Sequence, residues 1–152
     1  MSIADRLAEL HITLPVLPPP VANYVPAVRT GNLVYASGQT PTIDGKLTIT
    51  GKLGDTVSLE QGRQAARLAV VNCLAELATV ADLDDVVRIV KLTGYVASAS
   101  GFTDQPKVIN GASQVLEEVF GDAGRHARVA LGLAELPGGA PVEVDLIVEL
   151  RG

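Results

Sequence analysis

The chain has 152 residues, a length typical of a single domain with one core. Hydrophobic residues make up 47% of it and aromatic residues only 3%, so we expect a core of Val, Leu, Ile and Ala. The formal net charge of -5 argues against a nucleic-acid partner, because binding to a phosphate backbone depends on clustered Lys and Arg.

Three further features predict a cytoplasmic protein without a membrane anchor. No segment approaches the length and hydrophobicity of a membrane span. The N-terminus lacks the basic start and apolar stretch of a secretory signal. Cys73 is the only cysteine, which excludes an internal disulfide and suits a reducing compartment. Its helical spacing with apolar neighbours predicts a buried thiol and not a nucleophile.

Residues 1–20 are predicted to form an extension, and residues 21–152 a single domain. Ser2, with Asp5 three residues later, is a helix-capping pattern, so a short helix is expected from Ser2 to about Leu10. A proline-rich strap follows, which should run extended because proline fixes φ and removes a donor. Its PVLP stretch also fits a PxxP ligand, but no basic residue flanks it to orient that contact.

Period and turn signals predict the remaining elements in chain order. Three strands are expected, beginning at residue 25 and covering residues 33–37 and 46–49, with a tight turn at Asp44-Gly45. A capping box at Ser58 opens a long helix that continues to about residue 80. A strand at residues 86–97 and a second long helix, from Gln105-Pro106 to Gly121, come next. The chain closes with two strands, joined as a hairpin by the Pro/Gly turn at residues 136–141.

Two long helices are too few to cover both faces of such a sheet. We therefore expect an α+β fold, a mixed or antiparallel six-stranded sheet with both long helices on one face. If the apolar faces of both closing strands point to one core, Arg128 and Glu143 share the opposite face. Ala130 and Gly132 beside the arginine suit a pocket better than a solvated surface. In a single copy, that partly apolar face would be exposed to solvent, so an oligomer that buries it is expected.

Four stretches of the sequence match a known family in the same order: Asn23-Tyr24-Val25 followed by Ala27-Val28; LVYASGQ at residues 33–39; Val108-Ile109-Asn110; and Ala127-Arg128, Glu135-Leu136-Pro137 and Val142-Glu143-Val144. Together with the element order, they resemble the RidA (YjgF) family of small trimeric proteins. Its best-understood members are enamine/imine deaminases. The resemblance covers nearly the whole chain from residue 24 to residue 150. The extension and the GRHARVALG wording suggest a divergent branch.

The resemblance implies a chorismate-mutase-like homotrimer with sites in the clefts between protomers. It implies hydrolysis of 2-imino or 2-enamino acids to 2-keto acids and ammonia, with no metal or cofactor. Arg128 stands in the position of the family's substrate arginine, whose planar fork suits a carboxylate. Glu143 stands in the glutamate position and is the candidate general acid/base.

By family position, five further residues would form the substrate pocket: Tyr24, Ser37, Gly38, Asn110 and Ala130. The pattern departs from the family in three places. Ala130 stands where many deaminase members carry a cysteine, and His126 replaces a proline before the Ala-Arg pair. The loop before Gln105 is longer, which could displace Asn110. Ala130 and the longer loop favour the alternative of a non-catalytic trimer that binds a small carboxylate metabolite, whereas Glu143 beside Arg128 favours the enzyme.

Each candidate residue also has a plain structural interpretation. Arg128 could form an interface ion pair with Glu143 or Asp145, and glutamate is common on exposed strand faces. Tyr24 could anchor the strap, and the Ser-Gly-Gln stretch could simply end a strand. His126 alternates onto the face of Arg128 but has no Ser or Cys partner nearby in the sequence, which favours an ordinary strand-edge histidine.

Overall fold

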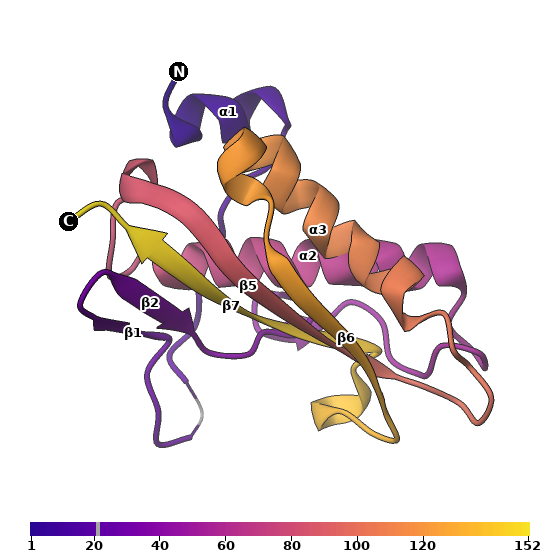
Figure 1. Ribbon diagram of the computed structural model, residues 1–152. Coiled ribbons are helices and arrows are strands. Elements are labelled where there is room, and N and C mark those ends of the chain that lie inside the picture. Colours follow the sequence, from indigo (N-terminus) through magenta and orange to yellow (C-terminus); the bar gives the residue numbers. More distant parts are fainter. Residues whose placement is uncertain (21) are drawn as a thin grey trace.

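The computed structural model describes residues 1–20 and 22–152 (Figure 1). Its elements, in chain order, are α1 (Ile3–Glu9), β1 (Ala27–Thr30), β2 (Leu33–Ala36), β3 (Thr42–Ile43), β4 (Lys46–Leu47), α2 (Leu59–Leu77), β5 (Val86–Ala97), α3 (Gln105–Phe120), β6 (Ala127–Leu133) and β7 (Val142–Leu150). Short 3-10 turns cover Leu83–Asp85, Gly121–Gly124 and Pro137–Gly139. No helix of the described residues is long and apolar enough to cross a membrane.

One mixed sheet carries both long helices on the same face. Its strand order is β1-β2-β7-β5-β6, and α2 and α3 pack side by side against it (Figure 1). Aliphatic residues of the helices and of β5 and β7 fill the layer between them, including Leu74, Ile89, Ile109 and Leu146. The α+β class with two helices on one face is therefore confirmed.

The predicted helix and turn signals are confirmed where they depend on local chemistry. The Ser58 Oγ accepts a hydrogen bond from the Gln61 amide at 3.1 Å, and the Ser58 amide donates to Gln61 Oε1 at 2.9 Å. Asp44 and Gly45 both adopt positive φ, 53° and 77°, which is the backbone of a tight hairpin turn. These contacts lie within a few residues of each other, so the sequence specifies them directly.

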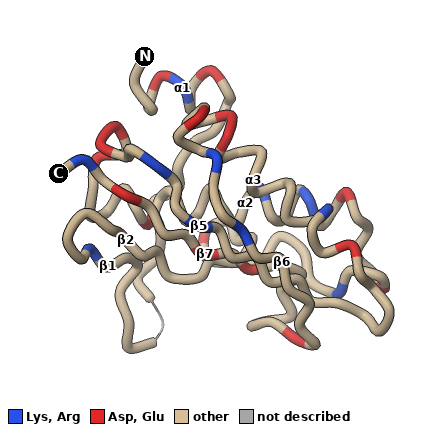
Figure 2. Tube along the Cα trace, viewed as in Figure 1, with Lys and Arg blue, Asp and Glu red and all other residues tan. Residues whose placement is uncertain are grey.

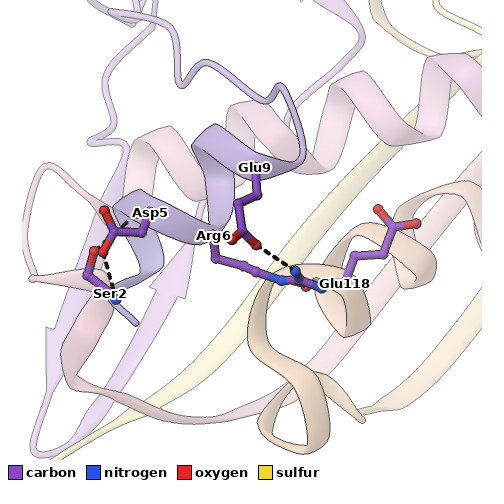
Figure 3. Close-up of polar contacts among 5 residues, drawn as sticks. All are labelled: Ser2, Asp5, Arg6, Glu9 and Glu118. Carbon is purple, nitrogen blue, oxygen red and sulfur yellow. Dashed lines mark hydrogen bonds and ion pairs between the residues drawn. The ribbon is translucent and has the colours of Figure 1, made fainter.

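The N-terminal helix is docked on the end of α3, as Figure 3 shows. The predicted cap is present, because the Ser2 amide donates to Asp5 Oδ2 at 3.2 Å. Arg6 Nε donates to the backbone oxygen of Glu118 on α3 at 2.8 Å, and Leu7 is buried. From α1 the strap runs without helix or strand, and its residues 17–20 reach the cavity that holds Glu143.

The contact between the two long helices depends on Gly111, and this yields a stability prediction. A Cβ at Gly111 would lie 2.2 Å from the backbone oxygen of Arg63 on α2, closer than real contacts allow. Gly111→Ala should therefore destabilise the fold by about 1–3 kcal/mol, although alanine is the better helix former. Urea unfolding checks this, with the exposed Gln114→Ala on the same helix as the control. An alanine variant as stable as the wild type would contradict it.

The expected six-stranded sheet is wrong by one strand. The predicted third strand begins at Lys46 as β4, but it pairs with β3 in a separate two-stranded sheet. The turn at Asp44-Gly45 folds the chain back on itself, so β4 meets its local partner. Both edges of β2 are already occupied, by β1 and by β7, which leaves no place for β4 beside it.

The expected closing hairpin is also wrong. β6 pairs parallel with β5, and β7 pairs antiparallel with β5, so β5 lies between the two closing strands. A parallel pair needs a crossover, and α3 supplies it between β5 and β6. The Pro/Gly segment at residues 136–141 connects β6 to β7 past the end of β5. Alternation predicts strands but does not identify their neighbours.

The most consequential correction concerns the faces of the sheet. Arg128 pairs in register with Leu92, which pairs with Leu146, so its side chain points to the helix-covered face. Glu143 pairs with Tyr95, and this row lies on the uncovered face. The two residues predicted to share one face therefore project from opposite faces of the same sheet.

The reason lies in β6, which is an edge strand. Its small residues, Ala130 and Gly132, face α3, and a Cβ at Gly132 would lie 2.7 Å from Gln105 Nε2. The larger Val129 and Leu131 consequently lie on the uncovered face, where Leu131 is exposed. In β6 the apolar face is thus not the core face, contrary to the assumption made from alternation.

Candidate functional site

Two separate cavities contain most of the predicted site residues. We call the first the acidic cavity: it has a volume of about 320 Å³ and is lined by Leu17, Pro18, Pro19, Pro20, Tyr24, Pro26, Gly38, Gln39, Thr40, Thr42, Gly45, Glu76, Pro137 and Glu143. We call the second the basic cavity: it has a volume of about 340 Å³ and is lined by Asn110, Ser113, Glu117, Arg125, His126 and Arg128. Both volumes suit a small molecule.

Glu143 enters the acidic cavity from β7, directly against Gly38. A Cβ at Gly38 would lie 2.6 Å from Glu143 Oε2, so the missing side chain leaves room for the carboxyl group. Burial raises the pKa of Glu143, and the nearby carboxylate of Asp145 adds to this effect. Asp145 itself accepts a hydrogen bond from the Tyr95 hydroxyl at 2.9 Å. A carboxyl with a raised pKa exchanges protons more readily near neutral pH than an ordinary glutamate.

A second carboxyl group in the acidic cavity, Glu76 on α2, escaped the sequence analysis. Its side chain is only 1% exposed, and burial raises its pKa to about 8, so it is mostly protonated at neutral pH. Its Oε1 has no hydrogen-bond partner among the described residues. The available signal was its spacing: Glu76 lies three residues after Cys73, which was predicted to be buried, and residues at this spacing are neighbours on a helix surface.

The remaining residues predicted near this cavity differ in their position. Tyr24 lines it and is half exposed, next to the end of the strap. Ser37 does not line it, because its hydroxyl donates to the backbone oxygen of Val25 at 2.6 Å. That bond ties the end of β2 to the segment before β1. Cys73 lies beneath, fully buried as predicted, with a pKa raised by burial.

Arg128 is held on the basic cavity by residues of α3. Its Nη1 donates to Asn110 Oδ1 at 2.8 Å and to Ser113 Oγ at 3.2 Å, and its Nη2 approaches the backbone oxygen of Pro106 at 3.4 Å. A guanidinium group has five N–H donors, so two stay without a partner among the described residues. Basic positions follow each other along the segment that leads into β6 (Figure 2).

His126 has a hydroxyl partner, Ser113, although no Ser or Cys lies near it in the sequence. Its Nε2 lies 2.9 Å from Ser113 Oγ, and its Nδ1 lies 2.6 Å from the backbone oxygen of Gly124. Ser113 was missed because it comes from α3, thirteen residues earlier. It lies three residues after Asn110, however, and residues at this spacing share a helix face. Ala130, also predicted here, packs against the core beside Arg128 and does not line the cavity.

One chain does not bring Arg128 and Glu143 together. They belong to different cavities, and β5 separates their strands, which are about 10 Å apart across the sheet. No ion pair joins Arg128 to Glu143 or Asp145 within the part of the chain that the structure describes. In the same residues, no group of three or more His, Cys, Asp or Glu side chains could hold a metal ion.

Comparison with known proteins places the chain in a family. Residues 4–150 match the family model described as "YjgF/chorismate mutase-like, putative endoribonuclease". The chain belongs to the YjgF family. Its fold is accordingly of the chorismate-mutase-like type, and membership of the family that also carries the name RidA is confirmed.

Individual proteins are similar to this chain over nearly their whole length. Protein Atu1372 of Agrobacterium tumefaciens, of unknown function, is 48% identical, with a TM-score of 0.89 over 98% of this chain and 92% of that one. Protein TCP17 of Trypanosoma cruzi is 44% identical over 98% of this chain and 94% of its own length. The 2-iminobutanoate/2-iminopropanoate deaminase of Dermatophagoides farinae is 32% identical over 92% of this chain and 95% of its own.

Proposed function

We propose that this protein hydrolyses 2-imino and 2-enamino acids to 2-keto acids and ammonia, in clefts between neighbouring copies of a cytoplasmic homotrimer. The observation that supports this most is that Arg128 and Glu143 line two different cavities. A substrate with a carboxylate at one end and an imine at the other needs both Arg128 and Glu143. Because one chain points them to opposite faces of the sheet, such a substrate would lie between two copies.

The uncovered face of the sheet supports assembly. It exposes Val28, Tyr35 and Leu131, large apolar side chains that water would otherwise cover. Exposed apolar patches of this kind mark interaction surfaces. In a closed symmetric ring, the basic cavity of one copy, with Arg128, would meet the acidic cavity of the next copy, with Glu143, at every interface.

The two cavities would supply different parts of the reaction. The free donors of Arg128 would bind the substrate carboxylate through two parallel hydrogen bonds, which fixes the imine carbon in place. Glu143, with its raised pKa, would give a proton to the imine nitrogen as water attacks the carbon. The reaction needs no cofactor. The name of the Dermatophagoides relative supports this activity.

Replacing the Glu143 carboxyl separates catalysis from binding. Glu143→Gln should lower turnover about 100-fold, because general acid–base groups typically contribute at least that much. Binding of 2-oxobutanoate should change little, since Arg128 is intact. The assay generates 2-iminopropanoate in situ, traps the remaining imine with semicarbazide and follows pyruvate. Glu149→Gln, on the same face of β7 but outside both cavities, is the matched control.

The outcome also tests the alternative of a non-catalytic binding protein, which Ala130 in place of the usual cysteine favours. Wild-type protein that binds 2-oxobutanoate but does not accelerate imine loss would support that alternative and contradict the proposed activity. Unchanged turnover in Glu143→Gln would remove the acid/base role from this residue.

A further inference from the structure

The hydrogen bonds around His126 form a chain with a single consistent direction. A backbone carbonyl only accepts, so the 2.6 Å contact with Gly124 places a proton on His126 Nδ1. In the neutral ring, Nε2 then carries the lone pair and accepts from the Ser113 hydroxyl at 2.9 Å. Arg128 only donates, so Ser113 Oγ receives its hydrogen bond at 3.2 Å. With the ring neutral, the Ser113 proton is therefore directed at His126.

This is the arrangement of an activated hydroxyl. A hydroxyl bonded to a histidine, whose other nitrogen is fixed by a third group, is the general design by which proteins raise the basicity of a serine oxygen. The Ser113 oxygen also lies within hydrogen-bond distance of Arg128 Nη1. A molecule whose carboxylate is bound by the guanidinium would consequently have its reacting carbon close to Ser113.

We propose that Ser113 and His126 form a second proton-transfer site, in which Ser113 contacts the attacking water and His126 accepts its proton. This inference rests on the proposed function, and it assigns the base while Glu143 acts as the acid. Two groups with opposite roles, in two different environments, are the usual way to carry out acid and base steps at one pH. Glu117 and Arg125 are the other charged groups that line the cavity with Arg128.

The proton movements balance over the cycle. As the water oxygen bonds to the imine carbon, the water proton passes to Ser113 Oγ and the Ser113 proton passes to His126 Nε2. The π electrons move to nitrogen, which takes a proton from Glu143. When the carbinolamine collapses, its hydroxyl returns a proton to Glu143. The imidazolium returns its proton through Ser113 to the nitrogen, the C–N bond breaks, and ammonia leaves.

A purely structural role is the competing explanation, since the same contacts would also orient Arg128. The two roles differ in their kinetics. A group that only orients Arg128 affects carboxylate binding, whereas a proton acceptor affects the chemical step. His126→Ala and Ser113→Ala should each lower kcat on the order of 100-fold, with KM and 2-oxobutanoate binding within a few-fold of wild type.

The experiment measures kcat and KM for 2-iminopropanoate in these variants, with Gln114→Ala on the exposed side of α3 as the control. Ser113→Thr keeps a hydroxyl and should retain most turnover, and added imidazole should restore part of the activity of His126→Ala. Unchanged kcat in both alanine variants, or a raised KM with normal kcat, would overturn the relay. Inactive wild-type protein would instead contradict the proposed function itself.

A second measurement does not depend on turnover. The chain has two histidines, so nitrogen NMR of the wild type and a His11→Gln variant assigns His126. The relay requires the neutral ring of His126 to carry its proton on Nδ1. A proton on Nε2 would reverse the bond to Ser113 and overturn the proposal, even in a variant whose folding is otherwise normal.

Discussion

Arg128→Ala is expected to abolish measurable binding of short 2-keto acids. Among the described residues that line the basic cavity, only the Arg128 guanidinium is fixed by two polar side chains and has donors left over. Removing one partner of a charge-assisted, partly desolvated pair typically costs 2–5 kcal/mol, so we expect affinity for 2-oxobutanoate to fall at least ~30-fold. Isothermal titration calorimetry measures this directly.

Two further variants sharpen the test of Arg128. Arg128→Lys should recover only part of the affinity, because an ammonium group lacks the planar fork that matches a carboxylate. Arg88→Ala removes an exposed arginine from the neighbouring strand β5 and should leave binding unchanged. Since the arginine partners are polar and partly exposed, the alanine variant should still fold and assemble. Loss of assembly with binding retained would favour the structural ion-pair interpretation.

The second large effect concerns Glu76 and the pH dependence of stability. Burial raises the pKa of Glu76 from 4.5 to about 8 in the folded chain, while an unfolded chain releases the proton near the ordinary value. The folded state thus binds the proton more tightly. The contribution of protonated Glu76 to the free energy of unfolding is fully present below pH 4.5 and is lost as the pH rises to about 8. The shift corresponds to on the order of 5 kcal/mol at most.

Urea unfolding between pH 5 and pH 8 checks this expectation. The wild type should lose stability steadily with rising pH, and Glu76→Gln should remove most of that loss, because the amide has no proton to release. A shallower slope should remain, since Glu143 also has a raised pKa. Glu60→Gln, an exposed position at the start of the same helix, should keep the wild-type slope. Equal slopes in wild type and Glu76→Gln would contradict the assignment.

The sequence allowed prediction of the features that depend on neighbours along the chain. The Ser2 and Ser58 caps, the turn at Asp44-Gly45 and the end of α3 at Gly121 all lie where the local patterns indicated. Each is decided by hydrogen bonds or backbone geometry within four residues. Strand positions were predicted for the same reason, because alternation is also a local pattern.

Strand order could not be predicted in this way, and the site depends on it. The assumption that consecutive strands pair placed β6 beside β7. The assumption that the apolar face of β6 points to the core put Arg128 on the face of Glu143. In the structure β5 separates them, and the small residues Ala130 and Gly132 turn the other side of β6 toward α3. Which face of β6 turns toward α3 depends on how closely the helix can approach an edge strand. The alternation of apolar and polar residues carries no information about that distance.

The resemblance to the YjgF family pointed to seven site residues. Tyr24, Gly38 and Glu143 line the acidic cavity, and Asn110 and Arg128 line the basic cavity. Ser37 and Ala130 line neither. Neither Glu76 nor Ser113 was selected. Both come from helices and reach their cavities only through tertiary packing. Their helical spacing relative to residues already singled out was the one signal that could have identified them.

In the proposed function, every site is shared by two copies of the chain. Arg128→Ala and Glu143→Gln should each be nearly inactive alone. The two variants are unfolded, mixed in equal amounts and refolded. If assembly is random, a copy with an intact Arg128 will meet a copy with an intact Glu143 in the required order at about a quarter of the interfaces. The mixture should therefore regain about a quarter of wild-type imine hydrolysis. A mixed sample as inactive as either variant alone would show that the site lies within a single chain and would contradict a site shared by two copies.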